Sequence, residues 1–256
     1  MTTVTRPGLV VRGVKRVLRI LTWPFRFLAL VGRVERIERQ LFVKAHVDRS
    51  ARPTRSVEGV DYAFFARMFH APGDIMREHF RWYVPLLRGR RTILDIGCGR
   101  GEFLDALREA GLSGTGVELD EGQASECRAR GHTVVIADLF AHLPAVPDGS
   151  LDAVFSAQLV EHLPFAKVQE LFGLVHRKLA SGGLFIAETV NPHCLVGLKL
   201  FHLDPTHVTV LPPELLEFVG KSAGFADVRT VYPNVWRGER EPYFEHSQYA
   251  GVFEKT

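Results

Sequence analysis

Three closely spaced glycines between a β-rich run and a helical pattern constrain the fold more than any other part of this chain. The run 92–96 is rich in isoleucine, leucine and threonine, and it leads into a turn that contains Gly97, Gly99 and Gly101. Apolar residues at helical spacing follow over positions 103–110. Glycine lets the backbone adopt a positive φ and lets a ligand approach closely. A strand, a glycine-rich turn and a helix N-terminus together predict a cradle for a nucleotide cofactor.

The next β-rich run, 115–120, supplies an acidic partner for this turn. Glu118 stands about 20 residues after the first glycine, where an acid at a strand end accepts hydrogen bonds from both ribose hydroxyls. The glycines are spaced G-x-G-x-G, whereas a nicotinamide fingerprint is G-x-G-x-x-G. The spacing therefore favours a different nucleoside-bearing cofactor.

Several segments resemble one family. D-I-G-C-G-R-G-E-F at 95–103 and G-V-E-L-D at 116–120 resemble motif I and the acidic motif of class I S-adenosylmethionine-dependent methyltransferases. A-D-L at 137–139 and P-D-G-S-L-D-A-V at 147–154 are also similar to that family. The resemblance implies an α/β fold, with a Rossmann-like, seven-stranded, mostly parallel sheet, helices on both faces and an antiparallel last strand.

The same resemblance implies S-adenosylmethionine as the cofactor. The three glycines would hold its methionine part, and Asp95 would orient the turn or the amino group. Glu118 would bind the ribose, and Asp138 with Leu139 would flank the adenine. The residues expected to bind the cofactor are Asp95, Gly97, Gly99, Gly101, Glu118, Leu119, Asp138, Leu139 and Gln158.

From position 91 onward, strand and helix patterns alternate, which predicts a parallel sheet with right-handed crossovers. Strands are expected near 92–96, 115–119, 133–137, 151–156, 183–189, 227–232 and 247–253, and helices near 101–110, 121–130, 165–179 and 213–223. Before them, the aromatic-rich segment 61–87 reads as two helices separated by Pro72 and Gly73. In the family such helices cover the cofactor and shape the substrate pocket, so Tyr62 or Trp82 could face the site.

The N-terminal region differs in charge from the rest of the chain. Residues 1–56 hold 13 of the 32 Lys and Arg but only 3 of the 29 Asp and Glu. Within them, 10–21 reads as a basic amphipathic helix, and 30–47 reads as a second helix that either packs on its own domain or makes a homodimer contact. We therefore expect a basic helical arm and linker over 1–56 and a methyltransferase domain over 57–256. The domain is mildly acidic, which disfavours a nucleic-acid partner.

The chain also carries signals about its location. No apolar run approaches the ~18 residues of a membrane span, and no small-residue cleavage site is evident. The three cysteines are scattered without metal-type spacing, which favours a reducing compartment. These features predict a cytoplasmic protein whose basic arm could contact the inner face of the membrane peripherally.

Candidate catalytic residues follow the fourth and fifth strands, where this type of sheet opens its crevice. A hydroxyl is a poor nucleophile at neutral pH, so methyl transfer to it needs a base or a metal ion. Glu161, His162 and His207 are the predicted catalytic residues and the predicted ligands of Mg²⁺ or Mn²⁺. The alternative is a hydrogen-bonded Glu–His pair that only lines the pocket. E-H here resembles the E-x-x-E-H metal motif of quinone and small-RNA O-methyltransferases, except that Gln158 replaces the first Glu.

The late motifs bear on the acceptor. E-T-x-N-P at 188–192, D-P-T-H-V at 204–208 and P-P-E-L-L-E-F at 212–218 resemble bacterial methyltransferases of polysaccharide and O-antigen synthesis, near actinobacterial enzymes that methylate mannose-based polysaccharides. The resemblance implies O-methylation of a sugar hydroxyl in a saccharide acceptor. The alternatives are an RNA 2′-O-methyltransferase, a quinone or small-molecule O-methyltransferase, and a regulatory subunit that binds the cofactor without catalysis. The intact glycine motif, with Glu161 and His162, disfavours the last.

Overall fold

A computed structural model describes residues 62–69, 71–233 and 246–256. The chain divides into two compact units, Met1–Val43 and Lys44–Thr256, and every described residue belongs to the second. The predicted arm over 1–56 lies outside the described residues. Its amphipathic helix, its dimer contact and the domain boundary at 56–57 therefore stay predictions.

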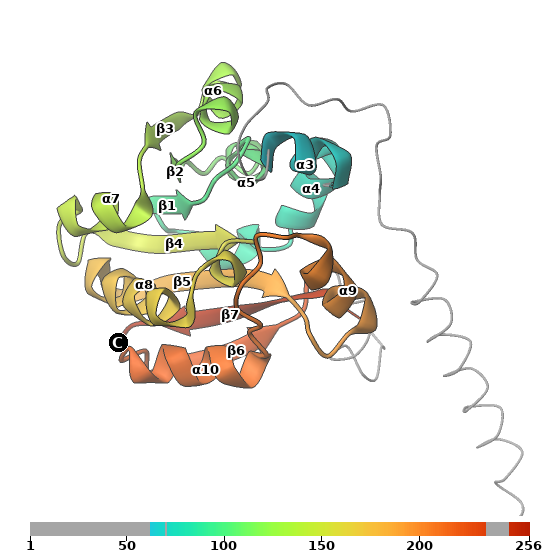
Figure 1. Ribbon diagram of the computed structural model, residues 1–256. Coiled ribbons are helices and arrows are strands. Elements are labelled where there is room, and N and C mark those ends of the chain that lie inside the picture. The colour runs from blue at the N-terminus through green and yellow to red at the C-terminus, as the bar shows by residue number, and fades with distance from the viewer. Residues whose placement is uncertain (1–61, 70, 234–245) are drawn as a thin grey trace, which may run out of the picture. The chain divides into compact units, whose positions relative to one another are not determined.

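The second unit is built around a seven-stranded sheet in the order β3-β2-β1-β4-β5-β7-β6 (Figure 1). Its strands are β1 (Ile93–Ile96), β2 (Thr115–Glu118), β3 (Thr133–Ile136), β4 (Leu151–Ala157), β5 (Leu179–Val190), β6 (Asp227–Val231) and β7 (Gln248–Glu254). The first five strands pair in parallel, and β7 pairs antiparallel with both β5 and β6. The fold class predicted from the sequence is confirmed. The strand β5 begins earlier than expected because Leu179 pairs with Leu151.

The helices also follow the predicted order. The expected ones are α3 (Tyr62–Phe69), α4 (Gly73–Phe80), α5 (Glu102–Glu109), α6 (Glu121–Ala129), α8 (Phe165–Lys178) and α10 (Pro213–Ser222). Two helices were not predicted, α7 (Leu139–Ala145) and α9 (Leu195–Leu203). The first is short and contains Pro144, and the second is apolar around most of its circumference. Neither therefore shows the alternation that marks an amphipathic helix.

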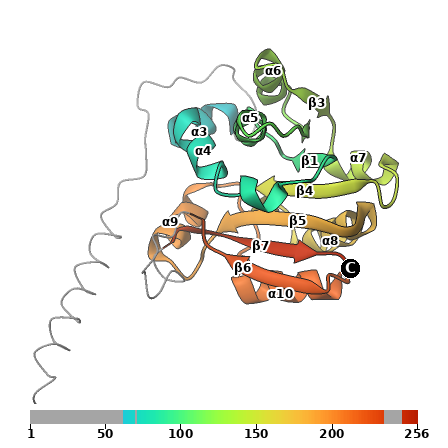
Figure 2. The same cartoon turned by 180° about the vertical axis from the view of Figure 1, so that it is seen from behind.

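Helices cover both faces of the sheet (Figures 1 and 2). On one face Leu94, Val154 and Phe185 pack in a core cluster with α8 and α10. On the other, Ile93 and Phe155 pack with α4, α5 and α6. Successive residues of each strand point to opposite faces, so the central strands are apolar on both sides. The carboxyl ends of β1, β2 and β4 then lie along one edge, where the glycine turn begins.

A 3₁₀ turn (Val160–His162) follows β4, and another (Val84–Leu87) precedes β1. Among the residues that the structure describes, no helix has the length and apolar character needed to span a membrane.

Candidate active site

The glycine turn leaves β1 and wraps back over β2. The backbone N–H groups of Gly97 and Cys98 donate to the carbonyl of Val117, at 2.8 and 3.2 Å. Gly101 caps α5 with a φ of 88°, and a Cβ there would lie 2.5 Å from the Cys127 sulfur. The turn therefore needs glycine at this position both for its backbone angle and for space. It borders a cavity of about 540 Å³, a size typical of small-molecule sites.

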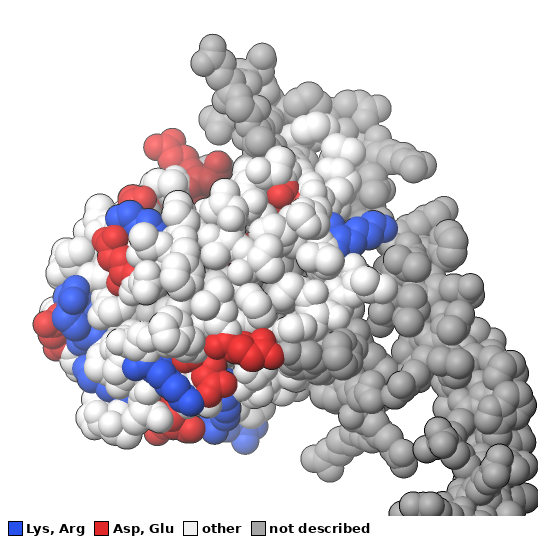
Figure 3. Space-filling model, turned by 60° about the horizontal axis from the view of Figure 1, so that its bottom comes forward, with Lys and Arg blue, Asp and Glu red and all other residues white. Residues whose placement is uncertain are grey.

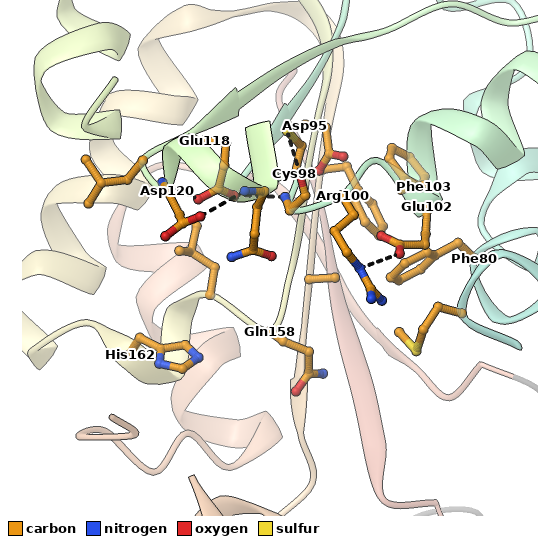
Figure 4. A pocket seen from close by; sticks show the side chains of 18 of the residues that line it. Phe80, Asp95, Cys98, Arg100, Glu102, Phe103, Glu118, Asp120, Gln158 and His162 are labelled. Atoms are coloured by element: carbon orange, nitrogen blue, oxygen red, sulfur yellow. Dashed lines mark hydrogen bonds and ion pairs between the residues drawn. The ribbon is translucent and has the colours of Figure 1, made fainter. Parts of the chain in front are cut away.

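Glu118 stands at the end of β2 with its carboxylate held in place by the backbone. Its Oε2 accepts from the N–H of Gly99 at 2.8 Å, and its Oε1 accepts from the N–H of Asp120 at 2.9 Å. Both residues line the cavity with Glu118 (Figure 4). Each carboxylate oxygen can accept a second hydrogen bond. The geometry suits the two ribose hydroxyls expected at this position.

Asp95, at the end of β1, places a buried carboxyl group beside the cavity. It is 2% exposed, and its Oδ2 has no hydrogen-bond partner among the described residues. Burial raises the pKa of Asp95 well above its usual range, and Cys127, Glu118 and Glu102 add to the rise. An unpaired buried carboxylate facing a cavity is suited to a cationic ligand group. The amino group of a bound S-adenosylmethionine would meet this need.

An aromatic wall closes another side of the cavity. Phe103 and Phe155 stack with ring centroids 3.6 Å apart. Phe80 meets both edge-on, at 6.0 and 5.7 Å. Helix α4 contributes Phe80 and Met76 to the lining, so the helices before β1 do shape this cavity. In the helical segment before β1, Phe80 lines the cavity, whereas Trp82 packs against the core and is not part of the lining.

The remaining predicted cofactor residues divide into two groups. Leu119, 67% exposed, and Gln158 line the cavity. Asp138 and Leu139 are not part of its lining. The Asp138 carboxylate caps α7, where Oδ1 accepts from the N–H groups of Phe140 and Ala141 at 2.7 and 3.2 Å. The contact of Asp138 and Leu139 with the adenine therefore stays a prediction.

His162 follows β4 and lines the cavity (Figure 4). Thr206 is also part of the lining. Its Nδ1 lies 2.8 Å from Thr206 Oγ1. That hydroxyl donates its own proton to Asp204 Oδ1 at 2.6 Å. His162 must therefore be the donor in the first bond, which leaves the lone pair of the neutral ring on Nε2. Asp204 and Thr206 belong to the D-P-T-H-V motif singled out in the sequence, but their contacts with His162 were not predicted.

His207 joins the same cluster. Its ring centroid is 4.5 Å from that of His162. Its Nδ1 donates to the carbonyl of Phe201 at 2.9 Å, and its Nε2 lies 3.8 Å from Asp204 Oδ2. Burial lowers the pKa of His207, although Asp204 and the Phe201 carbonyl oppose the change. Ligand atoms of His162, Asp204 and His207 all lie within 4.8 Å of one another.

Glu161, the third predicted catalytic and metal-binding residue, is not part of this cluster and does not line the cavity. It is 0% exposed, and neither carboxylate oxygen has a hydrogen-bond partner among the described residues. Burial raises the pKa of Glu161 to about 8, against the lowering effects of its own backbone and of Thr189. Its backbone carbonyl accepts from the N–H groups of Val208 and Thr209, at 2.9 and 3.0 Å. The structure thus gives it a positioning contact with the histidine-bearing loop, and Asp204 occupies the place predicted for its carboxylate.

Comparison with known proteins shows similarity to methyltransferases. The sequence model described as "Methyltransferase domain" matches residues 64–230. The chain belongs to the methyltransferase domain family. A probable S-adenosylmethionine-dependent methyltransferase of Mycolicibacterium smegmatis is 33% identical over 138 residues, which are 53% of this chain and 52% of that protein. The name of that relative gives S-adenosylmethionine as its methyl donor.

Two further relatives show how far the similarity extends. A ubiquinone biosynthesis O-methyltransferase of Methylococcus capsulatus is 37% identical over 103 residues, 38% of this chain and 43% of its own length. The methyltransferase domain spans about half the length of the first curated relatives it matches. The crystal structure of a SAM-dependent methyltransferase from Archaeoglobus fulgidus superimposes with a TM-score of 0.68 and 29% identity, over 77% of this chain and all of that one.

Proposed function

We propose that this methyltransferase transfers the methyl group of S-adenosylmethionine to a hydroxyl of a saccharide acceptor, with His162 as the general base. The observation that carries the proposal is the His162 imidazole, which lines the cofactor cavity and is oriented by Thr206 and Asp204. In the reaction the acceptor oxygen attacks the methyl carbon and the carbon–sulfur bond breaks. The hydroxyl proton passes to His162 Nε2, and S-adenosylhomocysteine leaves with the sulfur's electron pair.

The Asp204 carboxylate assists this proton transfer at a distance. When His162 gains a proton, its ring becomes a cation, and the Thr206 hydroxyl connects that cation to the Asp204 carboxylate. General-base catalysis of this kind contributes about 10²–10⁴-fold to the rate. Asp204 is 6% exposed, so its charge acts in surroundings that screen it weakly.

Sequence similarity supports a sugar as the acceptor. The motifs at 188–192, 204–208 and 212–218 resemble enzymes that methylate polysaccharides. On the face shown in Figure 3, Lys and Arg side chains are interspersed with Asp and Glu. That face offers no continuous basic surface of the kind that binds a phosphate backbone. Quinone precursors are the main alternative, because the curated relatives include ubiquinone O-methyltransferases.

A divalent cation is a second candidate for activating the acceptor. His162, Asp204 and His207 offer two imidazole nitrogens and one carboxylate, a set that suits a divalent metal ion. Such an ion, Mg²⁺ or Mn²⁺, would lower the pKa of a bound hydroxyl. Activity that disappears with a chelator and returns with either ion would favour this version. Activity that is unaffected by the chelator would favour His162 acting alone.

An acceptor screen with labelled S-adenosylmethionine tests the proposed function. We expect label transfer to oligosaccharides or simple glycosides and none to RNA or quinone precursors. Transfer to a quinone or RNA alone would overturn the saccharide assignment. We further propose that the enzyme acts in the cytoplasm, with the basic arm over 1–56 serving as a contact with the inner membrane face or with a second copy.

A further inference from the structure

The end of β5 carries a buried carboxylate that the proposed chemistry does not use. Glu188 is 0% exposed. Its Oε2 accepts a hydrogen bond from the Tyr83 hydroxyl, and His79 Nε2 lies 2.7 Å from the same oxygen. His79 belongs to α4, and Tyr83 follows that helix directly. Burial lowers the pKa of His79, but Glu188 outweighs this effect and raises it overall. This contact and the Tyr83 hydrogen bond link α4 and the residues after it to the sheet.

This network reaches the cavity through Gln158. Its backbone N–H donates to the carbonyl of Glu188 at 3.0 Å, and its side-chain Nε2 lies 3.5 Å from Glu188 Oε1. Gln158 has a φ of 52° and is the one non-glycine residue with positive φ in the part of the chain that the structure describes. A side chain is kept in this strained region only where its surroundings fix it. Glu188 contacts Gln158 at both its backbone and its side chain.

The side chain fixed in this way lines the same cavity as the proposed base. Gln158 and His162 lie on the same short segment after β4, and both line the cavity. Figure 4 shows them together on the side of the cavity opposite Asp95 and Glu118, the residues expected at the cofactor. A carboxamide that spends one N–H on Glu188 keeps a second N–H and its oxygen. That combination of donor and acceptor matches a hydroxyl group.

We propose that Glu188, held by His79 and Tyr83, is a positioning residue that presents the Gln158 carboxamide to the acceptor. The carboxamide binds the hydroxyl next to the one that is methylated. This inference rests on the proposed function for the identity of its acceptor. It narrows the substrate class to saccharides with two neighbouring hydroxyls, one at His162 and the other at Gln158.

The test compares Tyr83→Phe and Glu188→Gln with the unchanged enzyme, using methyl hexopyranosides as acceptors. Each variant should raise the acceptor KM about tenfold, the value of one typical hydrogen bond, with a smaller change in kcat. The Kd of S-adenosylhomocysteine should stay within about threefold, because Asp95, Glu118 and the glycine turn, expected to hold most of the cofactor, lie outside this network. A monodeoxy analogue without the neighbouring hydroxyl should lose about tenfold in the unchanged enzyme and little more in Gln158→Ala.

Tyr249→Phe is the matched control, because the buried Tyr249 hydroxyl also donates one hydrogen bond, to the Leu211 carbonyl at 2.7 Å. It should leave the acceptor KM unchanged. An equal rise in KM for Tyr249→Phe would show a general effect of stability and overturn the inference. A Kd for S-adenosylhomocysteine that rises together with KM would also overturn it, because the network would then serve the cofactor.

A separate readout covers the case in which no sugar is methylated, which would refute the proposed function. The side-chain amide protons of Gln158, identified by their loss in Gln158→Ala, can be followed by NMR in the S-adenosylhomocysteine complex. The inference expects these protons to exchange slowly with solvent hydrogen, and to exchange faster in Glu188→Gln. Fast exchange with solvent already in the unchanged protein would overturn the positioning role whatever the acceptor.

Discussion

The Glu161 carboxyl group lies inside the protein without a hydrogen-bond partner among the described residues, and this burial has a consequence for stability. Its pKa of about 8 in the folded state exceeds its usual value of 4.5. Between these two values the folded protein holds a proton that the unfolded chain releases. The stabilising contribution is complete below pH 4.5 and is lost as pH rises toward 8.

Glu161→Gln should therefore flatten the dependence of stability on pH. The native protein should lose up to about 1.4 kcal/mol of unfolding free energy per pH unit through this group, and the variant should lose none of it. Urea unfolding at pH 5 and pH 8 measures the difference. Parallel stability profiles for the two proteins would show that the carboxyl group is already ionised in the folded state.

His162→Ala addresses the chemical step. Turnover should fall by about 10²–10⁴-fold, because the acceptor hydroxyl loses its base. Calorimetry should find the affinity for S-adenosylhomocysteine nearly unchanged. His142→Ala on α7 is the matched control, since His142 is not part of the cavity lining. Full activity in His162→Ala would remove both the general-base and the metal version of the mechanism.

Glu118→Ala addresses the cofactor. Hydrogen bonds to a charged group contribute roughly 1.5–3 kcal/mol, so the affinity for S-adenosylmethionine should fall by one to two orders of magnitude. Calorimetry measures this change directly. An unchanged affinity would separate Glu118 from the ribose and leave it only the backbone contacts with Gly99 and Asp120.

Among the secondary-structure elements, α5 has a glycine at each end, and the two glycines are required for different reasons. Gly101 at its start and Gly111 just after its end both have positive φ, 88° and 74°. A Cβ at Gly111 would meet nothing within 4 Å, whereas one at Gly101 would meet Cys127. Gly111→Ala should cost about 1 kcal/mol of unfolding free energy from backbone strain alone. Gly101→Ala should cost about 2 kcal/mol or more, measured by thermal unfolding. Equal costs would mean that Cys127 moves aside freely.

Elements formed by neighbouring residues could be predicted from the sequence, whereas contacts between distant segments could not. The strand, turn and helix over 93–109 are contiguous, so their pattern is visible in the residues themselves. His79 and Glu188 are 109 positions apart, and His162 and Thr206 are 44 apart. No periodicity or local motif links such pairs, because the sheet order brings them together. The cofactor half of the site was therefore predictable, and the network behind Gln158 was not.

For the whole molecule, the role of the basic arm over 1–56 can be tested by shortening the chain. A chain that begins at Val57 should still bind S-adenosylhomocysteine, because the cavity is lined by residues 76–206. If the arm serves association, light scattering should show a lower mass for the shortened chain, or vesicle binding should decrease. Loss of cofactor binding in a folded, shortened chain would contradict a separate role for the arm.

The carboxylates at the glycine turn also affect how the enzyme exchanges its cofactor. Glu118 and Glu102 lie close enough to Asp95 to raise its pKa. S-adenosylmethionine brings a sulfonium charge to the Glu118 carboxylate expected at the cofactor, and S-adenosylhomocysteine leaves without that charge. Methyl transfer itself therefore removes part of the attraction that holds the molecule, which favours replacement of spent cofactor by fresh cofactor. Salt should narrow the gap between the two affinities, since mobile ions screen a charge-dependent preference.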